Sequence, residues 1–318
     1  MNFTVSKYDA ATLYRIHDNQ LSIILTHVDD IMIISDKDNI NKIINIIEAN
    51  FSKVEIHKDE EIIQYLGIVI TRNRQNKSMK LKQPGHIEEL IESSNIDRDD
   101  TIDTPAGSDL FDTNDNDVPI EDIKKFQSVL MKAMYISKTR PDIKLVLGFL
   151  STKMNNPTKQ DEGKLIRLIK YINGTKDLGI VLKPTCLQIY CSADASHGIH
   201  HDFKSQSGNI VWMGSEVSGI IHCHSKKQKL ISRSSTEAEL ISYGSVVEAL
   251  WSRGILEEYG FKQQPIEVQQ DNKSKIIITN KGSGRSMRIE PRFLSFSGAI
   301  TSFCASICCI LFLNEPKI

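Results

Sequence analysis

Two adjacent aspartates interrupt an apolar stretch near the N-terminus of this sequence. Asp29 and Asp30 lie between the runs "LSIIL" and "IMIIS". Because burial of an unpaired carboxylate costs several kcal/mol, the pair is not expected inside a strand. Two arrangements fit the pattern. One is a tight hairpin turn, in which Asp tolerates unusual backbone angles and reaches water. The other is a divalent cation held by carboxylates at a hairpin tip.

Three further carboxylates stand beside predicted strands in the second half of the chain. Asp194 ends the strand "LQIYCSADAS", Asp271 follows the alternating "IEVQQ", and Glu239 belongs to the helical stretch "SSTEAELISYG". Acids that converge at the end of a sheet are typical of two-metal phosphodiester hydrolases, in which two ions lie about 3.5–4 Å apart. Each acid alone fits a turn residue or a helix cap equally well.

The stretch "STEAEL" offers two glutamates for such a site. On one helix Glu237 and Glu239 point about 200° apart. Ser234 stands three residues before Glu237, which is the spacing of a capping box. Glu239 instead shares a face with Tyr243 and Val246 and is expected to lean towards the sheet. Glu239 is therefore the predicted metal ligand.

A second metal motif is suggested by "HCHSKK". On a strand His222 and His224 share one face, whereas Cys223 points to the other. These three side chains cannot bind one tetrahedral zinc ion together. From the sequence alone we predict no zinc site there.

Length and composition indicate an ordinary folded protein. The 318 residues are enough for about two domains. A composition of 40% hydrophobic and 25% charged residues argues against wholesale disorder. The net charge of −1 excludes a general attraction to nucleic acid, so any such contact must come from local basic faces.

Cysteine usage and the N-terminus point to a reducing compartment. Six cysteines in a chain of this length do not form a disulfide framework, and no disulfide partner is expected. The N-terminal segment lacks the apolar core of a signal peptide.

Hydrophobic periodicity predicts the elements that must position these residues. The expected elements are a hairpin around Asp29, a helix over 38–51 with Asp38 as its N-cap, one buried strand over 61–74, and a basic hairpin over 72–83. An acidic, turn-rich segment follows at 97–119, and helices dominate 120–182. Strands and one long helix over 234–260 then predict a mixed sheet covered by helices.

One predicted helix carries a row of basic residues. Lys164, Arg167 and Lys170 recur at near-helical spacing. Such a row fits a solvated helix face, and it also fits a surface that follows a phosphate backbone.

Short stretches of the chain, in order, resemble one known family. The chain resembles the C-terminal part of Pol from copia-type LTR retrotransposons, which carries reverse transcriptase followed by ribonuclease H. The resemblance spans roughly Asn2 to Met287. The stretches are "HVDD", "QYLGIVI", "DTPAG", "TRPDI", "GTKDLGI", "ADAS", "KSQSGNIV", "SKKQ", "SSTEAEL", "EALW" and "QDNKS".

The resemblance implies an α/β (α+β) fold: a partial reverse-transcriptase palm with a helical thumb and connection, then a ribonuclease H-like mixed-sheet domain. The implied divisions are a partial palm (1–96), an acidic linker (97–119), a helical thumb and connection (120–183), a truncated ribonuclease H-like domain (184–290) and a divergent apolar tail (291–318).

The resemblance also implies functional roles, a cofactor and partners. Asp29 would be a polymerase metal ligand, with Asp30 as the second acid of that pair. Asp194, Glu239 and Asp271 would bind the two Mg²⁺ ions of the ribonuclease H site. The partners would be an RNA–DNA hybrid, or an RNA template with a DNA primer, and an intact Pol protein. The expected location is the cytoplasm, in a virus-like particle, or the nucleus.

Departures from the family pattern predict impaired activity. His27 replaces the aromatic residue that usually precedes the Val-Asp-Asp triplet. The third polymerase aspartate is expected well upstream of the hairpin. Only 28 residues precede Asp29, and Asp9, in "SKYDA", stands in a stretch that resembles a different part of the family. The fourth ribonuclease H acid, in an Ala-Asp-x-x-Thr-Lys stretch, is not found after Asp271. We expect no DNA synthesis from this chain and absent or very weak hybrid cleavage.

Two features allow other functions: the apolar tail at 293–313 and the basic row of Lys164, Arg167 and Lys170. Residues 293–313 carry no charge and are numerous enough to span a bilayer, which predicts a membrane anchor. Out-of-frame translation explains the same stretch, and it also explains why the resemblance stops there. The alternative functions are therefore a non-catalytic nucleic-acid-binding module and a membrane-tethered remnant.

Overall fold

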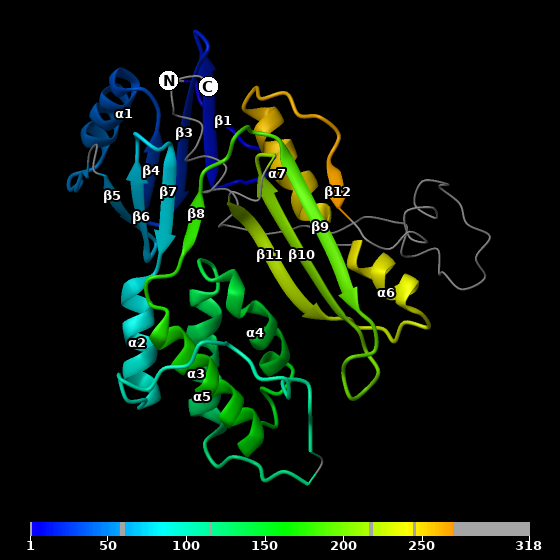
Figure 1. The fold of residues 1–318 in the computed structure, drawn as a ribbon. Coiled ribbons are helices and arrows are strands. Elements are labelled where there is room, and N and C mark those ends of the chain that lie inside the picture. The colour runs from blue at the N-terminus through cyan, green and yellow to red at the C-terminus, as the bar shows by residue number, and fades with distance from the viewer. Residues whose placement is uncertain (1, 58–60, 115, 216–218, 244–245, 270–318) are drawn as a thin grey trace.

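The computed structural model describes residues 2–57, 61–114, 116–215, 219–243 and 246–269 (Figure 1). Within these residues the fold is mixed α/β, with three four-stranded sheets and a group of helices. The α+β class predicted from the sequence agrees with this architecture. No described helix is long and apolar enough to cross a bilayer, and the tail at 293–313 lies outside the described residues.

The first sheet is an antiparallel meander in the order β1-β2-β3-β4. Its strands are β1 (Thr4–Val5), β2 (Thr12–His17), β3 (Gln20–His27) and β4 (Asp30–Ile34). The predicted hairpin around Asp29 is thus confirmed as β3 and β4. Ile23 and Leu25 point into the core from β3, as the two-residue period of a strand requires.

Helix α1 (Lys37–Asn50) follows this sheet, close to the predicted span. Its N-cap is Asp36, whose side chain accepts a hydrogen bond from the backbone N–H of Asn39 at 2.9 Å. The prediction of Asp38 as N-cap is therefore wrong by two positions. Asp38 lies in the first turn instead, where its negative charge interacts favourably with the helix dipole.

The second sheet has the antiparallel order β5-β6-β7-β8. Its strands are β5 (Ile62–Tyr65), β6 (Ile68–Asn73), β7 (Ser78–Lys82) and β8 (Ile180–Leu182). The single strand predicted over 61–74 is wrong. Leu66 and Gly67 have φ angles of 50° and 74°, and they reverse the chain between β5 and β6. The basic hairpin predicted next is confirmed as β6 and β7.

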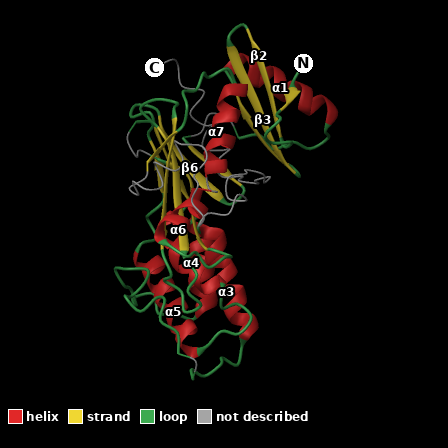
Figure 2. Cartoon of the chain, turned by 90° about the vertical axis from the view of Figure 1, so that its right-hand side faces the viewer, coloured by secondary structure: helices red, strands yellow, loops and turns green. Residues whose placement is uncertain are grey.

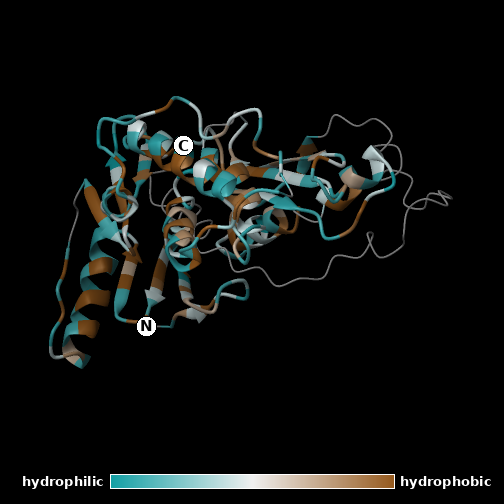
Figure 3. Cartoon of the chain, turned by 90° about the horizontal axis from the view of Figure 1, so that it is seen from below, coloured by the Kyte–Doolittle hydropathy of each residue, from teal (hydrophilic) through white to brown (hydrophobic). Residues whose placement is uncertain are grey.

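The helices between these strands form one packed group with its own apolar core. They are α2 (Pro84–Ser94), α3 (Ile123–Ile136), the 3₁₀ turn η1 (Pro141–Ile143), α4 (Lys144–Ser151) and α5 (Lys159–Gly174). The helical character predicted for 120–182 is confirmed. In Figure 3 the helices are striped brown and teal, as expected where one face packs and the other meets water.

The third sheet is mixed, as predicted, in the order β11-β10-β9-β12. Its strands are β9 (Ile189–Ser196), β10 (Gln206–Met213), β11 (Ile220–Lys227) and β12 (Glu267–Gln269). β12 runs parallel to β9, and the other pairs are antiparallel. The long helix predicted over 234–260 is described as two, α6 (Ser235–Ser242) and α7 (Val246–Glu258). Residues 244 and 245, which separate them, lie outside the described residues.

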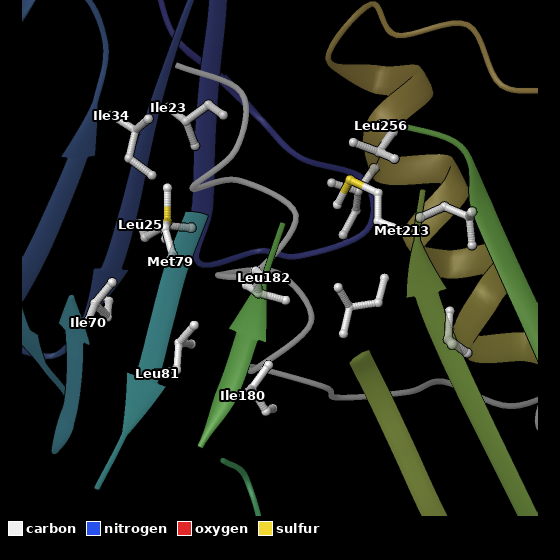
Figure 4. Packing of buried hydrophobic residues seen from close by; sticks show 14 of the residues in the cluster. Ile23, Leu25, Ile34, Ile70, Met79, Leu81, Ile180, Leu182, Met213 and Leu256 are labelled. Atoms are coloured by element: carbon white, nitrogen blue, oxygen red, sulfur yellow. The ribbon is translucent and has the colours of Figure 1, made fainter. Parts of the chain in front are cut away.

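One hydrophobic core joins all three sheets. It includes Ile23 of the first sheet, Leu81 and Leu182 of the second, and Met213 of the third, together with Leu256 of α7 (Figure 4). α7 lies between the first and third sheets (Figure 2). The predicted divisions at 96, 119 and 183 remain predictions. Two contacts cross them, because β8 pairs with β7 and the helical group contains α2.

A buried arginine connects two of the stretches that resemble Pol. Arg140 of "TRPDI" is 1% exposed, and its Nη2 donates to Asp142 at 2.7 Å. Its Nη1 donates to the carbonyl of Thr175, in "GTKDLGI", at 3.0 Å. Tyr171 donates to the same Asp142 carboxylate at 2.9 Å, and burial followed by this bond raises the pKa of Tyr171. The start of α4 is thereby fixed to the end of α5.

We expect Arg140→Met to lower the free energy of unfolding by about 3 kcal/mol, because it leaves the Thr175 carbonyl without this donor and Asp142 with the Tyr171 hydroxyl but no cation. This value is at the low end of the range for a broken buried pair, since Asp142 is 32% exposed. Urea unfolding followed by circular dichroism measures it. Arg98→Met, at an exposed arginine, is the control. Equal midpoints for the two variants would contradict this role of Arg140.

Candidate active site

Asp29 and Asp30 occupy the tip of the β3–β4 hairpin. His27 pairs with Asp30 across the hairpin, so Val28 and Asp29 form the turn. Val28 has a φ of 52° and is 90% exposed, and both aspartates are exposed. The expectation of a tight turn is confirmed, and the pair does not enter the core.

A third aspartate of the first sheet has a structural task. Asp9 accepts hydrogen bonds from the backbone N–H of Ala11 at 3.0 Å and from the hydroxyl of Thr12 at 2.9 Å. These bonds fix the turn before β2. Burial, with the charges of Asp30 and Asp9, raises the pKa of Tyr65 to about 12. The charges of Asp9 and Asp30 therefore both disfavour ionisation of the Tyr65 hydroxyl. The Asp9 carboxylate is at the same time hydrogen-bonded to Ala11 and Thr12.

Asp194 and Glu239 lie near the same end of β9. Asp194 is exposed and pairs with Gly208 of β10. The backbone N–H of the next residue, Ala195, donates to Oε1 of Glu239 at 3.2 Å. Glu239 is buried, and α6 packs on β9 and β10. The predicted orientation of Glu239 towards the sheet is confirmed.

Glu237 has part of the capping role that its spacing predicted. The Ser234 hydroxyl accepts from the backbone N–H of Glu237 at 3.2 Å, as in a capping box. The Glu237 carboxylate accepts from the backbone N–H of Arg233 at 2.6 Å, one residue before the N-cap, and not from that of Ser234. These two bonds fix where α6 begins, and therefore which of its faces carries Glu239.

The third predicted ligand of this site, Asp271, lies outside the described residues. The last described part of its strand is β12, where Gln269 pairs in parallel with Ser192 of β9. The described residues thus bring Asp194 and Glu239 to one end of the third sheet. Carboxylate oxygens are the ligands that Mg²⁺ prefers. Asp29 and Asp30 belong to the first sheet and are not part of this grouping (Figure 1).

The basic row on α5 faces the chain's own acidic segment. Lys164 is 8% exposed and its ammonium donates to the carbonyl of Asp112 at 2.6 Å, and burial lowers its pKa. Arg167 donates to Thr104 at 2.8 Å. Lys170 forms an ion pair with Asp100 at 2.6 Å. The interpretation of Lys164 as part of a solvated face is wrong, because the row holds the segment 97–119 against α5.

Sequence reasoning missed one group of possible metal ligands. Glu248 of α7 lies beside His222 and His224 of β11. In the sequence, the two histidines were weighed only with Cys223, which projects from the other face of the strand. The shared face of His222 and His224 was the available signal, and the approach of Glu248 depends on the packing of α7, which the sequence does not state.

Comparison with known proteins returns transposon polyproteins. The retrovirus-related Pol polyprotein from transposon RE2 of Arabidopsis thaliana is 29% identical over 78% of this chain, which corresponds to 17% of that polyprotein. That from transposon TNT 1-94 of Nicotiana tabacum is 28% identical over 88% of the chain and 22% of the polyprotein. The transposon Ty1-MR1 Gag-Pol polyprotein of Saccharomyces cerevisiae is 28% identical over 83% of the chain and 16% of the polyprotein.

The chain therefore spans about a fifth of the length of these relatives. No protein-family model and no solved structure matches it.

The contact of the acidic segment with α5 can be tested at Asn173. Its side-chain amide donates to the carbonyls of Asp97 at 3.4 Å, Arg98 at 2.9 Å and Asp100 at 3.2 Å. We expect Asn173→Ala to lower stability by about 1–2 kcal/mol and to speed trypsin cleavage after Arg98. Limited proteolysis followed by mass spectrometry measures this. Asn76→Ala, at an exposed turn, is the control, and equal cleavage in both variants would contradict the docking of the segment.

Proposed function

Because the homologues of this chain include retrovirus-related Pol polyproteins of copia-type transposons, we propose that it is a Pol-derived fragment with a ribonuclease H-type site on its third sheet. The substrate of this site is the RNA strand of an RNA–DNA hybrid. Its ligands are Asp194, Glu239 and Asp271, and its cofactor is Mg²⁺. The resemblance of "ADAS", "SSTEAEL" and "QDNKS" to the same polyprotein motivates this assignment.

The single observation that carries the proposal is the bond between Ala195 and Glu239. It holds the glutamate against the strand end that carries Asp194, although 44 residues separate the two bonded groups. Two carboxylates at one sheet end form a hard oxygen donor set, which suits Mg²⁺ better than soft metals. The donor chemistry therefore fits the ion that the family implies.

The assignment of Asp271 rests on the resemblance of the stretch "QDNKS". The last described residue before it, Gln269, pairs with Ser192 of β9, and the two strands run parallel. Asp271 itself lies outside the described residues, so its role as the third ligand is part of the proposal.

In the proposed mechanism each acid has a separate task. Asp194, Glu239 and Asp271 would hold Mg²⁺, which would supply an activated water and offset charge on the scissile phosphate and the leaving oxygen. Asp194, which is exposed, would be the ligand that is open to the incoming backbone of the hybrid. Glu239, which is buried, keeps its orientation through the Ala195 N–H and holds the inner side of the site. The 2′-hydroxyl of RNA is what allows such a site to distinguish the RNA strand from DNA.

Activity at this site is proposed to be weak. No Ala-Asp-x-x-Thr-Lys stretch stands between Asp271 and Ile318. The three carboxylates of the proposal would by themselves hold two ions less firmly than the four of the family pattern. Weaker metal binding slows a reaction whose charge stabilisation comes from those ions.

We expect the full chain to cleave the RNA strand of a labelled hybrid slowly, only with Mg²⁺. Asp194→Asn and Glu239→Gln should each reduce cleavage to the enzyme-free rate, because each removes a charged ligand. Gel analysis of the labelled strand measures the rate. Glu257→Gln, at a partly exposed site on α7, is the matched control and should retain activity. Unchanged cleavage by Asp194→Asn would contradict the site.

DNA synthesis is not part of the proposal. Two-metal chemistry needs ligands from more than one hairpin, and the nearby Asp9 is bonded into its own turn. We expect no primer extension by this 318-residue chain on an RNA template above the level of Asp29→Asn. Incorporation of labelled nucleotide that is lost in Asp29→Asn would contradict this expectation.

A further inference from the structure

The two histidines of "HCHSKK" form one side of a small polar group. His222 pairs with Val211 and His224 with Asn209, so both histidines project from the same face of β11. Their ring centroids are 5.9 Å apart, with the rings nearly perpendicular. Cys223 projects from the opposite face, as its alternation predicts. The sequence argument against a His-Cys-His zinc site therefore stands.

Glu248 completes the group from the facing helix. Its Oε1 lies 3.5 Å from Nε2 of His222 and 3.9 Å from Nδ1 of His224. One nitrogen or oxygen from each of the three residues can be chosen so that all lie within 4.8 Å of one another. Ligands at about 2.0–2.1 Å around a tetrahedral ion lie about 3.3 Å apart. Small rotations of the three side chains therefore bring them into a coordination sphere.

Burial affects all three side chains of this group. It lowers the pKa of His222 to about 3 and that of His224 to about 4, and the charges of Lys144 and Lys226 act in the same direction. Burial raises the pKa of Glu248, and the charge of Lys226 offsets this in part. The site proposed below rests on the positions of the three side chains.

Some polar atoms of the group also lack conventional partners. Nδ1 of His224 and Oε2 of Glu248 are inaccessible to water and make no hydrogen bond within the described part of the chain. The three side chains are only 12–16% exposed. Buried polar atoms with unused lone pairs, converging from two elements, are unfavourable unless a cation or proton satisfies them.

We propose that His222, His224 and Glu248 bind one divalent transition-metal ion, with Zn²⁺ as the fitting ion. Two neutral imidazoles and a carboxylate are a zinc donor set, whereas Mg²⁺ and Ca²⁺ prefer oxygen ligands throughout. Three protein ligands leave a fourth position for water or another small ligand. The bound ion would pin the edge strand β11 to α7, the helix that also packs on the first sheet.

This site is separate from the proposed hydrolytic one. Asp194, Gly208 and Ser225 stand in one cross-strand row, while His224, Asn209 and Ala193 stand in the next. Successive rows face opposite sides of a sheet. Zn²⁺ at the histidines and Mg²⁺ at Asp194 would therefore bind on opposite faces of the sheet. A variant that loses one metal site can still be tested for the other.

The test is metal binding by the full chain after removal of metals with a chelator. We expect tight binding of Zn²⁺ in competition with a chromophoric chelator, unaffected by a large excess of Mg²⁺. Substitution of His224→Gln or Glu248→Gln should weaken Zn²⁺ binding by more than about tenfold. Cys223→Ser, on the opposite face of the same strand, is the matched control and should bind as the parent chain does. Far-ultraviolet circular dichroism confirms that each variant is folded.

Cobalt(II) separates this site from thiolate sites elsewhere in the chain. We expect Co²⁺ to give the visible absorption of a four-coordinate ion without thiolate charge-transfer bands, and Glu248→Gln to abolish it. Thiolate bands, an effect of Cys223→Ser equal to that of His224→Gln, or unchanged Zn²⁺ binding by Glu248→Gln would each overturn the proposal.

Discussion

The pairing register of β9 is the constraint on which the candidate sites depend. β9 lies between an antiparallel neighbour, β10, and a parallel one, β12, so a slip of one residue against either would turn every side chain to the other face of the sheet. In the observed register Ala193 and Cys191 are buried and Asp194 is exposed. β10 pairs with β9 on one side and with β11 on the other. The pairing of β9 with β10 therefore also decides which residues of β9 lie in line with His222 and His224 of β11.

Packing of the helices then decides which acids approach the sheet. α6 begins where Ser234 and Glu237 cap it, and this start directs Glu239 towards β9. α7 is held from both sides, by the third sheet and by the first. The indole of Trp251 donates to the carbonyl of Tyr8, and the rings of Tyr14 and Tyr259 pack 5.4 Å apart. Glu248 belongs to α7, so the contacts of α7 with the first sheet also help to place Glu248 beside β11.

Sequence patterns predicted the features that depend on neighbouring residues. The β3–β4 hairpin, the mixed third sheet and the orientation of Glu239 all follow from periodicity and capping, which a sequence states directly. Interactions between distant segments were not visible in this way. The pairing of β8 with β7, the burial of Lys164 under the acidic segment and the approach of Glu248 to the histidines each depend on tertiary packing. A run of apolar residues likewise concealed the turn at Gly67.

The central claim is that Asp194, Glu239 and Asp271 converge on divalent metal. A crystal structure of the full chain grown with Mn²⁺, a substitute for Mg²⁺ that scatters anomalously, measures this directly. The account predicts an anomalous peak at about 2.0–2.3 Å from oxygens of Asp194 and Glu239, with the Asp271 carboxylate in the same coordination shell. A peak that is absent from this strand end, or an Asp271 side chain on another face of the sheet, would contradict the account.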